Sequence, residues 1–192
     1  MNRFADYFSN YVNDDTITYI GNGDITSFTV SRQDRELAVG LNLESFIDYG
    51  IIENSQNQIA RAMELKKVHI NPRFPKSEFS LDNIERILEY VRHESPAANG
   101  FFDGCEAELE DRTLTLCLKK GGKDVLESQK VDCAIANKIY ELFDLDFVVI
   151  FLEVQAFDIE KAVQKAVEER RAEEQLSLIH ISEPTRRVVL SY

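Results

Sequence analysis

The chain has 192 residues, of which 44% are hydrophobic, and a formal net charge of −12 at pH 7. This composition excludes a disordered chain and suits one ordinary domain or two small ones. No apolar run approaches the roughly 20 residues that cross a bilayer, and the start lacks a signal-peptide layout, so we expect a cytoplasmic protein without membrane contact. Because nucleic-acid affinity comes mostly from cation–phosphate attraction, the acidic charge favours protein partners.

The N-terminal part of the sequence predicts a small α+β domain. Apolar residues at spacings of three and four indicate helices, and alternation of apolar and polar residues indicates strands. The predicted elements are a helix over residues 4–12, strands over 16–20, 25–30 and 37–43, a helix over 53–65 and a strand over 68–70. The Asn22-Gly23 pair suits a tight hairpin turn after the first strand. We therefore expect a βββαβ sheet covered on one face by one helix.

Two prolines mark the boundary of this domain. Pro72 and Pro75 lack backbone donors and bias the residues before them to extended conformations. We therefore assign residues 1–75 to a first domain and residues 76–157 to a second, and we expect the two to pack separately.

The second domain is also predicted to be α+β. Ser80 is the expected N-cap of its first helix. The predicted elements are a helix over residues 84–91, a hairpin over 105–118, a second helix with its apolar positions over 131–142, which can be broken in two near Ser128, and a strand over 147–152. The last run is nearly unbroken in apolar residues, which is typical of a central strand. The order α-β-β-α-β, with helices on one face of three strands, is the layout of a type II KH-like domain.

The C-terminal part differs from both domains. Residues 158–175 carry a narrow apolar stripe and are otherwise charged, which predicts a connecting helix. Residues 176–192 begin without a turn and resemble the in-frame translation of an adapter used in preparing sequencing libraries. We treat this tail as non-native and assign no function to His180.

No catalytic or metal-binding pattern is recognisable in the sequence. Cys105, Cys117 and Cys133 are odd in number and widely spaced, which predicts reduced, buried thiols. His69 and His93 have no second ligand or catalytic partner at a suitable spacing. The glycine pairs complete no phosphate-binding motif. We therefore expect no catalytic residue, no metal ligand and no cofactor in this chain.

Charged residues gather at the predicted hairpin. An acidic row on its solvent side is interpreted as a solubility feature: Glu106, Glu108 and Glu110. One basic cluster follows the hairpin: Lys119, Lys120, Lys123 and Lys130. Because no aromatic residue is interleaved with these lysines, they are weak candidates for nucleic-acid contact, and a solvated loop is favoured.

A family resemblance rests on the order of the elements and on several short stretches. These are Tyr19-Ile20-Gly21-Asn22-Gly23-Asp24-Ile25, the helix over 84–91 that leads to Glu94-Ser95-Pro96, the hairpin with Leu114-Thr115-Leu116, a helix that ends in an aromatic residue before an apolar strand, and the charged helix after Asp158. Over roughly residues 1–175 the chain resembles the N-terminal region of the PolC-type DNA polymerase III alpha subunit of low-GC Gram-positive bacteria.

The resemblance implies two non-catalytic domains. The first would be similar to a C-terminal domain of the clamp-loader tau subunit and would bind tau, and the second would be KH-like. The parent family is a DNA-directed DNA polymerase, a nucleotidyltransferase that uses divalent metal ions and also carries a 3'-5' exonuclease. We expect this fragment to have no activity of its own, to tether the polymerase to tau and to contact the remainder of the polymerase chain.

Other functions remain open from the sequence. A stand-alone KH-like nucleic-acid-binding module is the alternative, and a small enzyme of unknown chemistry is a third. Nucleic-acid-binding KH modules clamp the backbone in a GXXG loop between two helices, whereas Gly121-Gly122 precedes a predicted helix. We therefore do not expect direct DNA binding. Tyr7 and Tyr49 fit exposed tau contacts and the edge of a core equally well.

Overall fold

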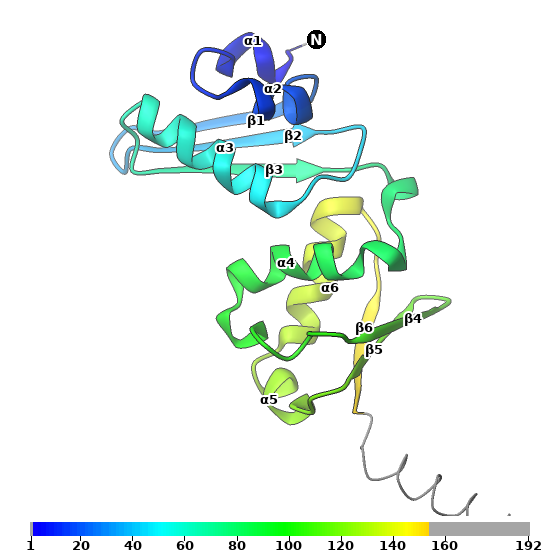
Figure 1. Cartoon of the computed structure of the whole chain (residues 1–192). Coiled ribbons are helices and arrows are strands. Elements are labelled where there is room, and N and C mark those ends of the chain that lie inside the picture. Colours follow the sequence, from blue (N-terminus) through cyan, green and yellow to red (C-terminus); the bar gives the residue numbers. More distant parts are fainter. Residues whose placement is uncertain (1, 154–192) are drawn as a thin grey trace, which may run out of the picture. The chain divides into compact units, whose positions relative to one another are not determined.

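Two three-stranded sheets organise residues 2–153, the part of the chain that the computed structural model describes (Figure 1). The elements of the first half are α1 (Phe4–Phe8), α2 (Asp14–Ile20), β1 (Asp24–Ser31), β2 (Glu36–Asn42), α3 (Tyr49–Ala62) and β3 (Lys67–Arg73). Those of the second half are α4 (Ile84–Glu94), β4 (Glu106–Glu110), β5 (Thr113–Leu118), α5 (Lys123–Ser128), α6 (Val131–Phe143) and β6 (Val148–Glu153). The chain is thus mixed α+β, and the predicted connecting helix and tail lie outside the described residues.

The first sheet has the strand order β1-β2-β3. β1 and β2 form an antiparallel hairpin, and α3 carries the chain to β3, which runs parallel to β2. One face is buried beneath helices because Leu37, Val39 and Leu41 of the central strand are at most 2% exposed. On β3, Val68 and Ile70 continue this apolar row. α3 extends over the sheet in Figure 1.

The predicted first strand is wrong, because residues 14–20 form helix α2. The β-branched run Thr16-Ile17-Thr18 favoured a strand locally. The side chain of Asn13 instead accepts a hydrogen bond of 2.9 Å from the backbone N–H of Thr16, and two aspartates follow in the first turn. This N-cap and the acidic first turn stabilise a helix, so the first half is ααββαβ rather than βββαβ.

The second sheet repeats the topology of the first. β4 and β5 form the predicted antiparallel hairpin, and β6 is parallel to β5 after the crossover through α5 and α6. The predicted break near Ser128 is present, since α5 ends there and α6 begins at Val131. The prediction that residues 147–152 form a central strand is wrong: β5 is central and β6 lies at the edge.

The two halves share one buried core at the proline segment. The rings of Phe46 and Phe74, from the first half, lie 5.5 and 5.7 Å from that of Phe143 on α6. The backbone N–H of Phe74 donates to the carbonyl of Leu142 at 2.7 Å. Residues 1–153 accordingly belong to one compact unit. The expectation of two separately packed modules is therefore not met, although each half keeps its own sheet.

The cysteines have three different environments. Cys105 is buried, Cys117 is half-buried and Cys133 is exposed, and all three thiols are free. The prediction of buried thiols is therefore correct for Cys105 and wrong for Cys133. Burial raises the pKa of the Cys105 thiol, and the nearby Glu85 carboxylate adds to this effect. No helix in the described residues combines the length and the apolar character needed to cross a membrane.

Candidate functional site

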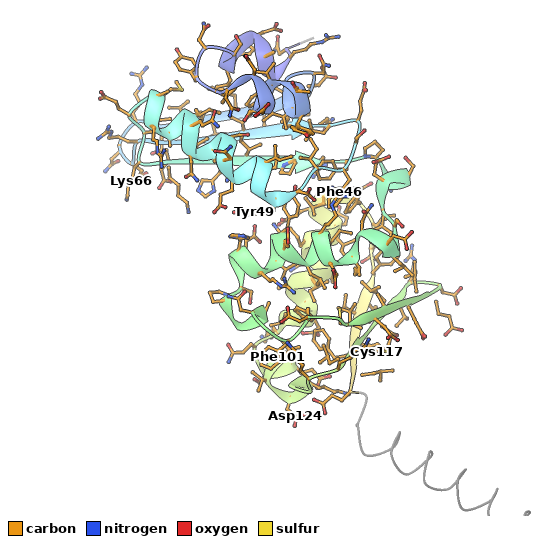
Figure 2. The ribbon with its side chains drawn as sticks, in the orientation of Figure 1. Phe46, Tyr49, Lys66, Phe101, Cys117 and Asp124 are labelled. Atoms are coloured by element: carbon orange, nitrogen blue, oxygen red, sulfur yellow. The ribbon has the colours of Figure 1, made fainter. Side chains whose placement is uncertain are left out.

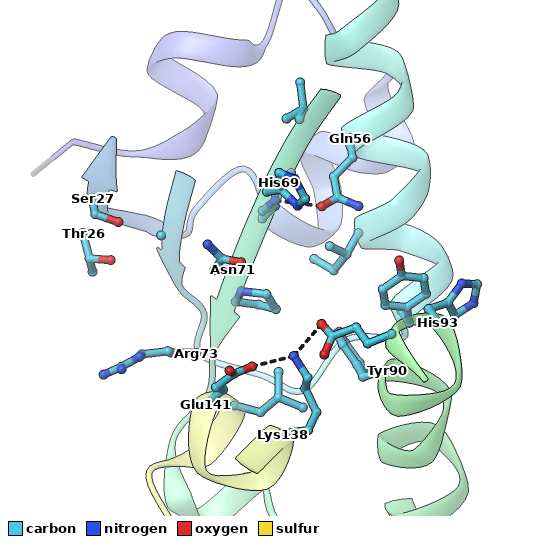
Figure 3. Close-up of a pocket in the computed structure, with 18 of the residues that line it drawn as sticks. Thr26, Ser27, Gln56, His69, Asn71, Arg73, Tyr90, His93, Lys138 and Glu141 are labelled. Atoms are coloured by element: carbon cyan, nitrogen blue, oxygen red, sulfur yellow. Dashed lines mark hydrogen bonds and ion pairs between the residues drawn. The ribbon is translucent and has the colours of Figure 1, made fainter. Parts of the chain in front are cut away.

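A groove of about 690 Å³ lies beside strand β3 (Figure 3). Its walls come from β3 and α3 on one side and from α4 and α6 on the other. The edge of β3 is closed to further pairing at two points. Gln56 of α3 accepts a hydrogen bond of 2.8 Å from the N–H of Ile70, and Pro72 has no N–H to donate. We call this concavity the β3 groove.

A buried lysine lies at the floor of the β3 groove. The Lys138 side chain is 10% exposed, and its Nζ donates to Glu94 Oε1 at 2.6 Å and to Glu141 Oε2 (Figure 3). Burial lowers the pKa of Lys138, but the two carboxylates outweigh it, so the pKa is raised overall. The ammonium therefore keeps its proton at neutral pH, and its ion pair with Glu94 links α6 to α4.

An aromatic wall closes the groove at the start of α3. The rings of Tyr49 and His93 are stacked with centroids 4.0 Å apart, and Tyr49 meets Tyr90 edge-on at 5.2 Å. The pKa of Tyr49 is raised, first by burial and then by the carboxylates of Glu53 and Glu94. The Tyr49 phenol therefore stays protonated at neutral pH. The groove thus presents the protonated Tyr49 phenol and the ion pairs of Lys138 with Glu94 and Glu141.

Tyr49 and His93 are held in place by packing between aromatic rings. Tyr90 donates from its hydroxyl to the backbone carbonyl of Ile47 at 2.7 Å, which fixes the ring against which Tyr49 packs. His69 is half-buried on β3 and lines the groove. Among the residues that the structure describes, no group of three or more His, Cys, Asp or Glu side chains could hold a metal ion.

The lysine cluster predicted from the sequence is largely neutralised. Lys119 pairs with Glu106 at 2.8 Å, and Lys123 lies 3.7 Å from Glu127. The remaining pair of this loop joins Lys120 to Asp103 at 2.9 Å. The pKa values of Glu106 and Asp103 are lowered, because each carboxylate accepts a hydrogen bond from its partner lysine and is also attracted by that lysine's charge. The structure therefore places three of the lysines between the end of β5 and the start of α5 and gives each a carboxylate.

Lys130 lies apart from these pairs, in the turn between α5 and α6. It is exposed and adopts a left-handed backbone conformation with φ of 55°. A nucleic-acid-binding KH module clamps the backbone in a GXXG loop between two helices, whereas this turn between α5 and α6 contains no glycine. The lysine cluster is thus a poor match to a phosphate clamp.

Exposed aromatic side chains gather in the first 28 residues. The sequence alone did not show whether such residues are exposed or lie at the edge of the core. Tyr7 lies on α1, Tyr11 follows it, Tyr19 is on α2 and Phe28 is on β1. Their exposed fractions are 51, 39, 58 and 50%, and Tyr140 on α6 is the other large aromatic side chain exposed in the described part of the chain. We call the first four the N-terminal aromatic set.

The elements that carry this set contact one another. The N–H of Phe4 donates to the carbonyl of Gly23, and the N–H of Ile25 donates to the carbonyl of Asn2, each at 2.8 Å. The Phe8 ring of α1 stacks on Phe28 of β1 at 6.2 Å. The set is therefore displayed by one locally connected framework. Its signal in the sequence was the density of aromatic residues before residue 30.

Comparison with known proteins assigns no family to the chain. A scan against protein-family models found no match, and a search of curated proteins found none either.

Proposed function

We propose that this chain is an N-terminal part of a PolC-type DNA polymerase III alpha subunit, which tethers the polymerase to the clamp-loader tau subunit and takes no part in catalysis. The observation that carries the proposal is the N-terminal aromatic set. Tyrosine and other aromatic side chains are enriched where proteins bind one another, because they bury a large area at a low cost in conformational entropy.

The position of the set agrees with the family resemblance. That resemblance assigns tau binding to the first domain, and Tyr7, Tyr11, Tyr19 and Phe28 all lie there. Tyr49, which the sequence left as an equal candidate, packs against His93 and Tyr90 and is not part of the set. The shared core removes one support, the separate packing of the domains, and helix α2 removes a second, the expected element order of the first half. The proposal then rests on the element order of the second half, the short stretches and the aromatic set.

The alternative of a KH-like nucleic-acid-binding module gains no support from the geometry. Three of the four lysines that would form its patch pair with Glu106, Asp103 and Glu127. Salt-dependent binding of single-stranded DNA that disappears after substitution of these lysines by glutamate would favour this alternative over tau binding.

Binding of the full chain to purified tau tests the proposal. We expect Tyr7→Ala combined with Tyr19→Ala to weaken binding by a factor of about 30, as removal of an aromatic anchor does. Tyr140→Ala is the matched control, since this tyrosine is 53% exposed but lies on α6 in the second half. It should leave binding unchanged.

Calorimetric titration gives the affinities, and thermal unfolding of each variant verifies its folding. Failure of the full chain to bind tau would contradict the tether. Equal loss in the double variant and in Tyr140→Ala would contradict the role of the N-terminal aromatic set.

A further inference from the structure

The last described strand has a sequence suited to burial on both faces but is buried on one. Val149 and Phe151 of β6 are 6 and 1% exposed, whereas Val148, Ile150 and Leu152 are 62, 40 and 48% exposed. An almost continuous apolar run is typical of a strand that is covered on both sides. Among the described residues nothing buries this second row, and contiguous exposed apolar side chains mark interaction sites.

The strand register defines what lies beside the exposed row. The residues of β5 that pair with it have short side chains: Thr113, Thr115 and Cys117. The residues of β4 that pair with these are all acidic: Glu110, Glu108 and Glu106. The open face of the second sheet therefore has an apolar row, a middle row of short side chains and an acidic row. We call it the β4–β6 face.

The spacing of these rows matches a helix. Neighbouring strands lie about 4.8 Å apart, so the outer rows are separated by about 10 Å. A helix with its side chains is about 10–12 Å across. The short side chains of Thr113, Thr115 and Cys117 leave room for a helix along β5. Such a helix would place one flank on the apolar row and the other on the acidic row.

The charge of this region selects the partner. Residues 76–153 contain 9 Lys and Arg and 17 Asp and Glu, a net charge of −8. Glu106 already pairs with Lys119, whereas Glu108 and Glu110 have no ion pair within the described residues. A second copy of this chain would bring acidic surfaces together, which like-charge repulsion disfavours. A basic partner gains the opposite interaction.

We infer that the β4–β6 face binds a basic amphipathic helix of another protein. The apolar side of that helix covers Val148, Ile150 and Leu152, and its lysine or arginine side chains pair with Glu108 and Glu110. The inference does not depend on the proposed tether to tau, because it concerns a different half of the chain. It also explains why an edge strand keeps three large apolar side chains on its open side.

A synthetic peptide tests this inference on the full chain. The peptide has about 18 residues, a length of about 27 Å as a helix, with leucines on one side and lysines along the neighbouring flank. A control peptide carries glutamates in place of the lysines. We expect the basic peptide to bind and the control peptide not to bind, as measured by fluorescence anisotropy.

Variants of the chain locate the contact. Glu108→Gln with Glu110→Gln, and separately Ile150→Thr, should each weaken peptide binding by about tenfold. Glu44→Gln with Glu89→Gln changes the net charge by the same amount at exposed positions outside the β4–β6 face and should have no effect.

Thiol alkylation gives a second readout. Cys117, which is labelled in Figure 2, lies on β5 and by register belongs to the middle row of the face, and Cys133 is exposed on α6. Bound peptide should slow alkylation of Cys117 and leave Cys133 unaffected.

Three results would overturn the inference. Equal weakening by the Glu44 and Glu89 control would mean that only net charge matters. Loss on Ile150→Thr without loss on the Glu108 and Glu110 substitutions would indicate an uncharged partner or strand pairing at the edge. Protection of Cys117 before any peptide is added would mean that the chain itself covers the face.

Discussion

The two halves of the molecule have the same strand topology but differ in how the third strand of the sheet is covered. In each half an antiparallel hairpin leads through helices to a third strand that is parallel to the second. The third strand of the first sheet, β3, has its edge closed by Gln56 and Pro72. That of the second sheet, β6, carries an exposed apolar row. Topology fixes which strand lies at the edge, and the side chains decide whether its backbone is closed to pairing and whether both of its faces are covered.

The comparison of the two sheets assumes that both halves of the molecule unfold as one unit. Phe143→Ala is the strongest test of this assumption. Phe143 is 1% exposed and contacts Phe46 and Phe74 of the other half. We expect the free energy of unfolding to fall by about 3–5 kcal/mol because a cavity replaces the ring. Hydrogen exchange should accelerate in β2 and β5 alike. Loss of protection in the second sheet alone would show two independent cores, and Tyr140→Ala, exposed on the same helix, serves as control.

The ion pairs of Lys138 test how α4 and α6 are held beside the β3 groove. Glu94→Gln with Glu141→Gln removes both anionic partners of the buried ammonium and should lower the free energy of unfolding by about 1–2 kcal/mol. Lys138→Met in the same background should restore most of the loss, because no buried charge then remains. Urea unfolding measures both. A Lys138→Met variant as unstable as the double glutamine variant would refute this account.

The raised pKa of Lys138 predicts how the free energy of unfolding depends on pH. A lysine that holds its proton more tightly in the folded state stabilises the fold at neutral pH and loses this contribution as the pH rises through the folded-state pKa. The loss should therefore occur above the ordinary lysine value of 10.5. Lys138→Met should lack this alkaline component in urea titrations between neutral and alkaline pH. An identical alkaline profile in both proteins would assign the effect to other groups.

The closed edge of β3 predicts a smaller effect. Gln56→Ala leaves the N–H of Ile70 without its acceptor and should cost about 1 kcal/mol. Faster exchange of the Ile70 amide, observed by NMR, would locate the change. Asn57→Ala, at an exposed position of the same helix, should alter neither quantity. If both substitutions behave alike, the hydrogen bond does not protect the edge.

The exposed row of β6 predicts the smallest effect on stability. Ile150→Thr should change the free energy of unfolding by no more than about 0.5 kcal/mol, since the side chain is exposed and threonine suits a strand. Val149→Thr, on the buried side of the same strand, should cost more because it buries a hydroxyl. Urea unfolding of the two variants compares the faces directly. A large loss on Ile150→Thr would show that the row already has a cover.

Hydrophobic periodicity correctly predicted the elements in which the residue pattern and the tertiary packing favour the same structure. β2, β5 and α4 follow from alternation or helical spacing, and the break between α5 and α6 was anticipated near Ser128. α2 was missed because its β-branched residues favour a strand while the cap at Asn13 favours a helix. The position of β6 was missed because an apolar run indicates burial on two faces, and the strand order decides whether the second face is covered.

The site was harder to predict than the fold because its parts are distant in the chain. The β3 groove combines Gln56, His93 and Lys138, which share no local spacing. The lysine loop was visible in the sequence, but its pairing with Asp103 and Glu106 depends on how the hairpin folds. The N-terminal aromatic set was visible as composition, whereas its exposure was not.

The hydrogen bond from Phe74 to Leu142 limits how the chain can be dissected. The donor belongs to the exit from β3, and the acceptor is one of the last carbonyls of α6, which have no partner within their own helix. Truncation at Lys76 would remove this donor together with the Phe46 and Phe74 rings. In the resulting fragment the C-terminal end of α6 would fray and Phe143 would be uncovered. A fragment that carries the second sheet therefore needs a cut upstream of Phe46, so that both supporting rings are retained.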